Sequence, residues 1–154
     1  MTLYFAYGSN MNRAAMQRRC PGARALGAAR LDGYRFFVGI DGWGSVRKSP
    51  GDKVHGVLWR LTPRDVAALH SYELLHMGLY DVRRLGVRKG ARLMPAMIYV
   101  LRRRAPGRPK PGYVEMIAAC ARGWKLPERY VRSVERWSVS RWTGTRVIDG
   151  GDVI

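Results

Sequence analysis

A short turn near the start of the chain has residue types suited to binding an anion. Residues 3–7 form an aromatic and aliphatic run that predicts a buried strand, and the run stops at a tight turn over residues 8–10. Residues 11–19 then favour a helix, with Asn10 as the expected N-cap. Because the first N–H groups of a helix lack an intrahelical acceptor, they favour an anion or a carbonyl oxygen that becomes negative during reaction.

Other kinds of catalytic site find no support in the residue spacing. Ser9 has neither the flanking glycine pattern nor the partnered histidine and aspartate of a serine nucleophile. The histidines, at positions 55, 70 and 76, do not show His-Glu-x-x-His spacing. Cys20 and Cys120 are far apart and match no metal or redox motif, so we expect buried thiols. The sequence therefore predicts no metal and no cofactor.

Strands are expected to dominate the first two thirds of the chain. Strand candidates after the first turn are residues 34–40, 54–61, 80–87 and 94–102, and the last two are suited to pair as a hairpin. The glycine-rich residues 41–44 predict a turn or mobile loop, and Ser-Pro-Gly-Asp at 49–52 predicts a turn.

Helices are expected after residue 62 and again late in the chain. Thr62 and Pro63 predict an N-cap and first helical position, which puts Glu73 near the end of that helix. A glutamate there is ordinarily solvated, so the residue types alone leave its role open. Residues 113–124 and 127–137 have helical spacing after an irregular loop at 102–112, and the tail from Ser138 is expected to be extended. This order predicts one mixed α/β domain over residues 1–154, built around a sheet or small barrel.

The composition is that of a globular protein with an unusual charge. Hydrophobic residues make up 47% of the 154 residues, no apolar run is long enough to cross a bilayer, and the first residues do not form a signal peptide. We therefore expect a cytoplasmic protein without a membrane partner. Lys and Arg number 28 against 11 Asp and Glu, which gives a formal charge of +17. That charge attracts polyanions, but the basic residues are scattered and no nucleic-acid-binding motif accompanies them, so nucleic acid is disfavoured as a partner.

Segments along nearly the whole chain resemble the γ-glutamylcyclotransferase family, part of the AIG2-like superfamily. Residues 4–10, Tyr-Phe-Ala-Tyr-Gly-Ser-Asn, look like its signature strand and loop. Residues 49–59 resemble its Ser-Pro-Gly-Asp turn and the following Gly-Val-hydrophobic-Trp strand. Residues 69–80 resemble the segment with the catalytic glutamate, and residues 109–113 with the later helices resemble the C-terminal part.

The resemblance implies a fold, an activity and a set of site residues. The fold is a γ-glutamylcyclotransferase-like α+β fold, a small mixed β-barrel or sheet with flanking helices. The activity is conversion of a small γ-glutamyl substrate to 5-oxoproline without a cofactor. Glu73 would be the catalytic acid and base, and its apolar neighbours would raise its pKa. The implied substrate-binding residues are Tyr4, Phe5, Ala6, Tyr7, Gly8, Ser9, Asn10, Tyr80 and Tyr113, with Tyr99 as a further aromatic of the pocket wall.

The chain departs from the family pattern in ways that leave the leaving group open. Leu74 stands where the family usually has glycine, and His70 where it often has aspartate. A γ-glutamyl group carried by an amine or by an acidic acyl carrier protein is an alternative substrate, and the +17 charge would speed association with such a carrier. The glutathione-specific and γ-glutamylamine branches tend to have leucine in place of Asn10, which argues against both.

A basic module without catalytic activity that binds nucleic acid is the alternative of another class. The presence of Glu73 speaks against it. The oligomeric state stays open between monomer and dimer.

Overall fold

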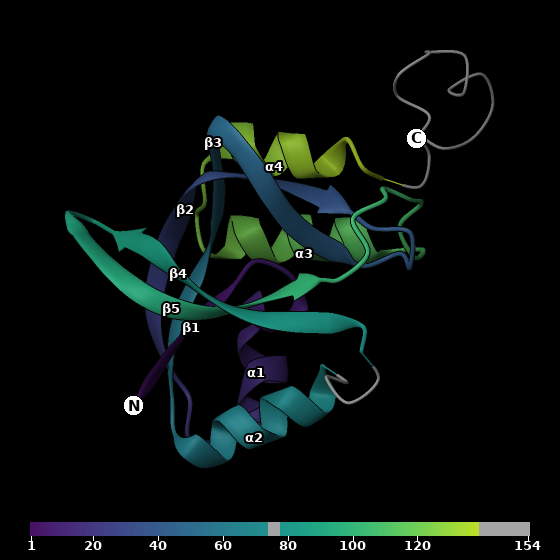
Figure 1. Ribbon diagram of the computed structural model, residues 1–154. Coiled ribbons are helices and arrows are strands. Elements are labelled where there is room, and N and C mark those ends of the chain that lie inside the picture. The colour runs from purple at the N-terminus through teal and green to yellow at the C-terminus, as the bar shows by residue number, and fades with distance from the viewer. Residues whose placement is uncertain (74–77, 139–154) are drawn as a thin grey trace, which may run out of the picture.

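The computed structural model describes residues 1–73 and 78–138 (Figure 1). Within these residues, five strands close into a barrel in the order β1-β3-β2-β4-β5. The strands are β1 (Thr2–Ala6), β2 (Arg24–Val38), β3 (Gly44–Leu61), β4 (Tyr80–Lys89) and β5 (Arg92–Leu101). Neighbouring strands are antiparallel except β1 and β5, which run parallel and meet at Tyr4 and Met97. The expected α+β class with a small barrel is confirmed.

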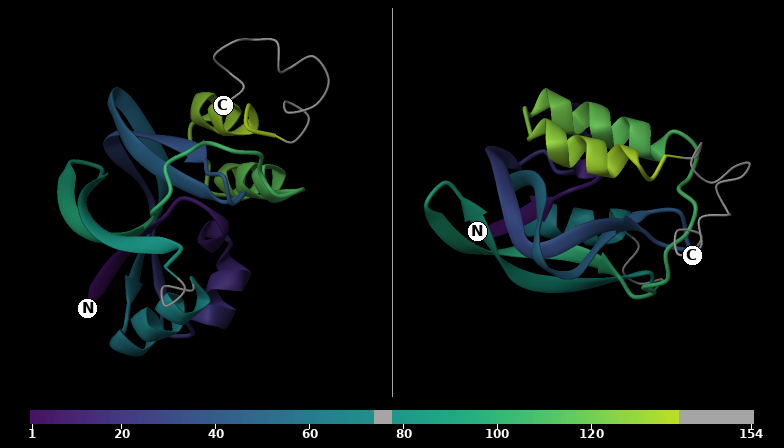
Figure 2. Two further views of the ribbon diagram at one scale, coloured as in Figure 1. Left: turned by 45° about the vertical axis from the view of Figure 1, so that its right-hand side comes forward. Right: turned by 90° about the horizontal axis from the view of Figure 1, so that it is seen from above.

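Helices flank the barrel on two sides. A 3₁₀ helix, η1 (Ser9–Met11), follows β1, and the α-helices are α1 (Arg13–Arg19), α2 (Pro63–Tyr72), α3 (Tyr113–Gly123) and α4 (Glu128–Glu135). Figure 2 shows α3 and α4 packed as a pair on one flank, with α1 and α2 together on another. None of the described helices is long and apolar enough to cross a membrane.

The barrel core holds the end of β1 rigidly. Phe5, Leu58 and Ile98, from β1, β3 and β5, are fully buried. Gly56 lets β1 and β3 approach closely, because a Cβ atom there would lie 2.3 Å from the carbonyl oxygen of Ala6. The turn that follows β1 therefore leaves the barrel from a fixed point.

The first helix begins later than expected, and Asn10 is not its N-cap. Residues 9–11 form η1, and Asn12 caps α1 by accepting a hydrogen bond from the N–H of Ala15 at 2.8 Å. The sequence offers an asparagine at both positions, and cap preference does not distinguish them. The side chain of Asn10 is instead buried and takes part in other contacts, described below.

The turn expected at residues 49–52 is a bulge inside a longer strand. Asp32 pairs with Lys53 and Tyr34 with Lys48, so four residues of β3 lie opposite Gly33 alone. Gly33 and Gly51 have φ angles of +81° and +88°, which glycine adopts without strain. The turn-forming residues thus bend β3 rather than end it. The strand expected at 34–40 likewise belongs to a longer one, which begins at Arg24 but ends at Val38, two residues before the expected end.

Several other sequence expectations are confirmed. The helix after Thr62 begins with Pro63 and a full capping box, and β4 and β5 form the expected hairpin. Helices α3 and α4 lie within the expected ranges. Beyond Ser138, the expected extended tail lies outside the described residues.

Candidate active site

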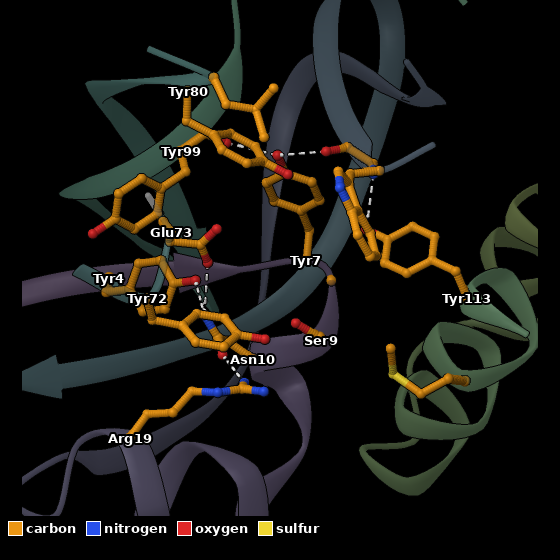
Figure 3. Close-up of a pocket in the computed structure, with 15 residues that line it drawn as sticks. Tyr4, Tyr7, Ser9, Asn10, Arg19, Tyr72, Glu73, Tyr80, Tyr99 and Tyr113 are labelled. Carbon is orange, nitrogen blue, oxygen red and sulfur yellow. Dashed lines mark hydrogen bonds between the residues drawn. The ribbon is translucent and has the colours of Figure 1, made fainter. Parts of the chain in front are cut away.

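A pocket of about 400 Å³ opens where β1 ends (Figure 3). Its wall comes from β1 and the turn after it, η1 and α1, the start of β3 with the loop before it, the end of α2 with Glu73, strand β4 with the residue before it, β5, and α3. Most of the residues expected from the sequence line it: Glu73, Tyr4, Tyr7, Gly8, Ser9, Asn10, Tyr80, Tyr99 and Tyr113. The closed barrel thus gathers side chains that are far apart in the sequence.

Glu73 is the C-cap residue of α2, and its carboxyl group faces the pocket (Figure 3). The helix fixes its backbone, because the N–H of Glu73 donates to the carbonyl oxygen of Leu69 at 2.9 Å. Burial raises the pKa of Glu73 to about 7, although the positive charge of Arg19 and a hydrogen bond from Asn10 act in the opposite direction. The group therefore exchanges its proton near neutral pH.

Asn10 joins Glu73 to β1 and α1. Its Nδ2 donates to Glu73 Oε2 at 3.1 Å and to the Tyr4 hydroxyl at 3.0 Å. Its Oδ1 accepts a hydrogen bond from the guanidinium of Arg19. That guanidinium lies over the ring of Tyr72, 3.7 Å from the centroid. Through Asn10, which belongs to η1, the Glu73 carboxylate is connected to Tyr4 of β1 and to Arg19 of α1.

Neutral tyrosines form much of the pocket wall. Burial is the main cause that raises the pKa of each phenol above its ordinary value, in Tyr4, Tyr7, Tyr80, Tyr99 and Tyr113. These side chains therefore act as neutral hydrogen-bonding groups rather than as bases at neutral pH. Tyr7 is held by donating to the backbone oxygen of Tyr99 at 2.6 Å.

The loop before β3 is fastened to α3 at the pocket edge. The N–H of Gly44 donates to the hydroxyl oxygen of Tyr113 at 2.8 Å, and the rings of Trp43 and Tyr113 meet edge to face with centroids 5.2 Å apart. A Cβ atom on Gly8 would lie 3.3 Å from the same hydroxyl. Tyr113 therefore sits close to both the loop and the first turn.

Residues Gly8, Ser9 and Asn10 of the first turn line the pocket. The bonds that define η1 run from the N–H of Met11 to Gly8 and from the N–H of Asn12 to Ser9, both 3.1 Å long. The N–H groups of Ser9 and Asn10 consequently have no acceptor within η1. Such donors suit an oxygen that carries negative charge.

Some predicted site residues do not reach the pocket. Phe5 and Ala6 are buried in the barrel and do not line it, so their predicted role in substrate binding stays a prediction. His70 does not line the pocket, but its Nδ1 lies 2.6 Å from the hydroxyl oxygen of Tyr99, which does. Leu74, Leu75 and His76 lie outside the described residues.

Sequence reasoning missed other lining residues, which are Arg19, Trp43, Gly44, Tyr72, Leu79 and Met116. The sequence does indicate Trp43 as a candidate, because it stands in a glycine-rich loop suited to cover a site. It does not single out Arg19, which is one of several arginines in a basic helix. Within the described ranges, no group of three or more His, Cys, Asp and Glu side chains is placed to hold a metal ion.

Comparison with known proteins gives consistent similarities. Residues 53–134, more than half of the chain, match the model of the AIG2-like family. A protein from Mus musculus named γ-glutamylcyclotransferase is 27% identical over 99% of this chain and 87% of its own length. A Homo sapiens protein of the same name is 27% identical over 92% of this chain and 81% of its own length. A solved structure named γ-glutamyl cyclotransferase superposes with a TM-score of 0.82 at 26% identity, covering 93% of this chain and 91% of that one.

Proposed function

The chain belongs to the AIG2-like family and is an enzyme of the γ-glutamylcyclotransferase type, and from that premise we propose that it converts a small γ-glutamyl compound to 5-oxoproline with Glu73 as general base and acid. One observation carries the assignment of Glu73. It is a carboxyl group with a pKa of about 7 that faces a pocket large enough for a small ligand.

The proposed reaction needs one group that both accepts and donates a proton. The α-amine of the substrate attacks its own γ-carbonyl carbon, so a new C–N bond closes a five-membered ring and the bond to the leaving amine breaks. The α-ammonium must first lose a proton, and the leaving nitrogen must gain one. Glu73 would carry the proton between them, and a pKa near the working pH suits both steps.

The first turn would bind the glutamyl part and its developing negative charge. Ser9 and Asn10 line the pocket and their N–H groups have no acceptor within η1, which supports a role in stabilising the oxyanion. Loss of one such donor typically slows a reaction by about 10²–10³. The tyrosine wall would hold the substrate folded for ring closure, which lowers the entropic cost of the attack.

The test is formation of 5-oxoproline from γ-glutamyl-alanine, measured by chromatography. Glu73→Gln keeps the size of the side chain but cannot take up the proton, so we expect a loss of about 10²–10⁴ in kcat. Glu115→Gln, at an exposed glutamate of α3, is the matched control and should keep wild-type activity. A wild-type protein that forms no 5-oxoproline from several γ-glutamyl compounds would contradict the proposal.

The pH dependence tests the role of Glu73 separately. The base must be ionised to accept the proton, so kcat/KM should rise with pH through about 7, the pKa of Glu73. An acidic limb near 4.5, the ordinary value for a glutamate, would contradict the raised pKa of Glu73, and a limb at neither value would mean that another group sets the rate.

A further inference from the structure

The orientation of the Asn10 amide is decided by its neighbours. Asn10 is only 2% exposed, and both ends of its amide are hydrogen-bonded. A guanidinium has donors and no acceptor, so the group facing Arg19 must be the amide oxygen. The NH₂ group is then directed at Tyr4 and Glu73, where an ionised carboxylate needs a donor.

Arg19 is itself held in place for this task. It ends α1, and its guanidinium lies on the ring of Tyr72, the residue before Glu73. Figure 3 shows Asn10 lying between Arg19 and Glu73, with hydrogen bonds on both sides. The Asn10 amide thus connects the last residue of α1, Arg19, with the C-cap residue of α2, Glu73.

We propose that Arg19 is a positioning residue for the cyclisation: it locks the Asn10 amide with its NH₂ toward Glu73 and so holds the carboxylate oriented and ionised. The catalytic consequence rests on the proposed function of Glu73. The hydrogen bonds from Arg19 to Asn10 and from Asn10 to Glu73 belong to the folded chain and do not depend on that function.

Removal of Arg19 would act on Glu73 in two ways that have the same sign. The positive charge that opposes the effect of burial is lost. The amide also becomes able to turn and present its oxygen to Glu73, which favours the protonated carboxyl group. Among residues 1–73 and 78–138, the other ionisable groups that interact with Glu73 are phenols that burial keeps neutral around neutral pH, and they are Tyr4, Tyr7, Tyr80, Tyr99 and Tyr113. None of these phenols replaces the lost charge.

The experiment measures the protonation of Glu73 directly. Infrared difference spectra over a pH series report the carboxyl group, with Glu73→Gln as the blank that identifies its band. In Arg19→Met and Arg19→Gln we expect the midpoint to rise by about one pH unit, because a nearby opposite charge is worth about that much or more. Arg19→Lys restores a charge and a donor, so its midpoint should return toward the wild-type value. Arg18→Met, at the exposed neighbouring arginine, should leave the midpoint unchanged.

Kinetics provide the second readout. The acidic limb of kcat/KM in Arg19→Met or Arg19→Gln should move up with the infrared midpoint, giving about a tenfold loss below the limb and recovery at high pH. Either variant that folds decides the question.

An unchanged midpoint in a folded Arg19→Met or Arg19→Gln protein would overturn the proposal. So would a raised KM with an unmoved limb, which would make Arg19 a substrate ligand. If the wild type forms no 5-oxoproline, the proposed function fails, while the infrared midpoint still decides whether Arg19 sets the state of Glu73.

Discussion

The burial that suits Glu73 to proton transfer also costs stability. Its pKa is raised from 4.5 to about 7 in the folded chain, so the folded state binds this proton more tightly than the unfolded state does. The stability that this group contributes is therefore fully present below pH 4.5 and is lost as the pH rises through 7. Above that pH the folded protein must bury a charge.

Glu73→Gln should consequently be more stable than the wild type at high pH. The uncharged amide can still accept the hydrogen bond from Asn10, so we expect a gain on the order of 2 kcal/mol in the free energy of unfolding at about pH 8. The gain should disappear near pH 4.5, where the wild-type carboxyl group is neutral. Urea denaturation at both pH values measures it, and a gain that is equal at the two would rule out this explanation.

At single residues, the sequence predicts the residues proposed to contact the substrate better than the residue proposed to position them. The turn residues and Glu73 could be recognised because their types suit the proposed chemistry. The contact between Asn10 and Arg19 could not, because it depends on where α1 begins, and an asparagine stands at both candidate cap positions. The resemblance also implies Phe5 and Ala6 through their place in the motif; they are buried and do not line the pocket, and their role in substrate binding stays a prediction.

Among the elements, α2 has the most direct task, since Glu73 follows its last residue. Its first turn is fixed by Thr62 Oγ1, which accepts from the N–H of Asp65, while the Asp65 carboxylate accepts from the N–H of Thr62, both at 3.1 Å. The same carboxylate accepts from the N–H of Gly22 at 3.2 Å, so the cap also holds the chain after α1. The start of α2 is thus anchored independently of the pocket.

Thr62→Ala should therefore lower stability without changing the chemistry. Loss of an N-cap side chain costs about 1 kcal/mol, and the pocket end of α2 keeps its own contacts to Asn10 and Leu69. We expect that loss in urea denaturation, with kcat for γ-glutamyl-alanine nearly unchanged. Thr62→Ser keeps the hydroxyl group and should behave as the wild type. An equal loss in the serine variant would show that the methyl group, not the cap, is responsible.

Elements with strong local signals were predicted, and those set by distant pairing were not. The cap of α2 and the β4–β5 hairpin follow from nearby residues. The length of β2 and the course of β3 through residues 49–52 do not, because the pairing of two long strands keeps a turn-forming segment inside the sheet as a bulge.

For the whole molecule, barrel closure assembles the pocket. The parallel contact between β1 and β5 places Tyr4 opposite Met97, and Tyr99 lies two residues further along β5. A barrel was one of two architectures that the sequence allowed, and closure cannot be derived from local patterns, since it joins the first strand to the last.

The +17 charge is a separate property of the whole surface. Arg24 lies opposite Arg60, and Arg35 opposite Arg47, across the β2–β3 ladder, so like charges face each other on the sheet. Ion pairs such as Arg30 with Asp32 lie at exposed positions, and the +17 already counts their acidic members, so they leave the excess of basic residues as it is. The surface should therefore attract polyanions at low salt.

Salt should separate this surface attraction from the reaction in the pocket. The screening length falls from about 10 Å at 0.1 M to about 3 Å at 1 M, which weakens long-range attraction but not the direct hydrogen bonds at Glu73. We expect kcat/KM for γ-glutamyl-alanine to change by less than about threefold over that range, while affinity for a single-stranded DNA probe falls by about 10² or more. A γ-glutamyl group on an acidic carrier protein, if it is a substrate, should lose activity through KM as salt rises. An equally steep loss with γ-glutamyl-alanine would instead mean that the net charge acts on the small substrate itself. If turnover of the carrier-bound group does not depend on salt, the charge is no longer a reason to expect such a partner.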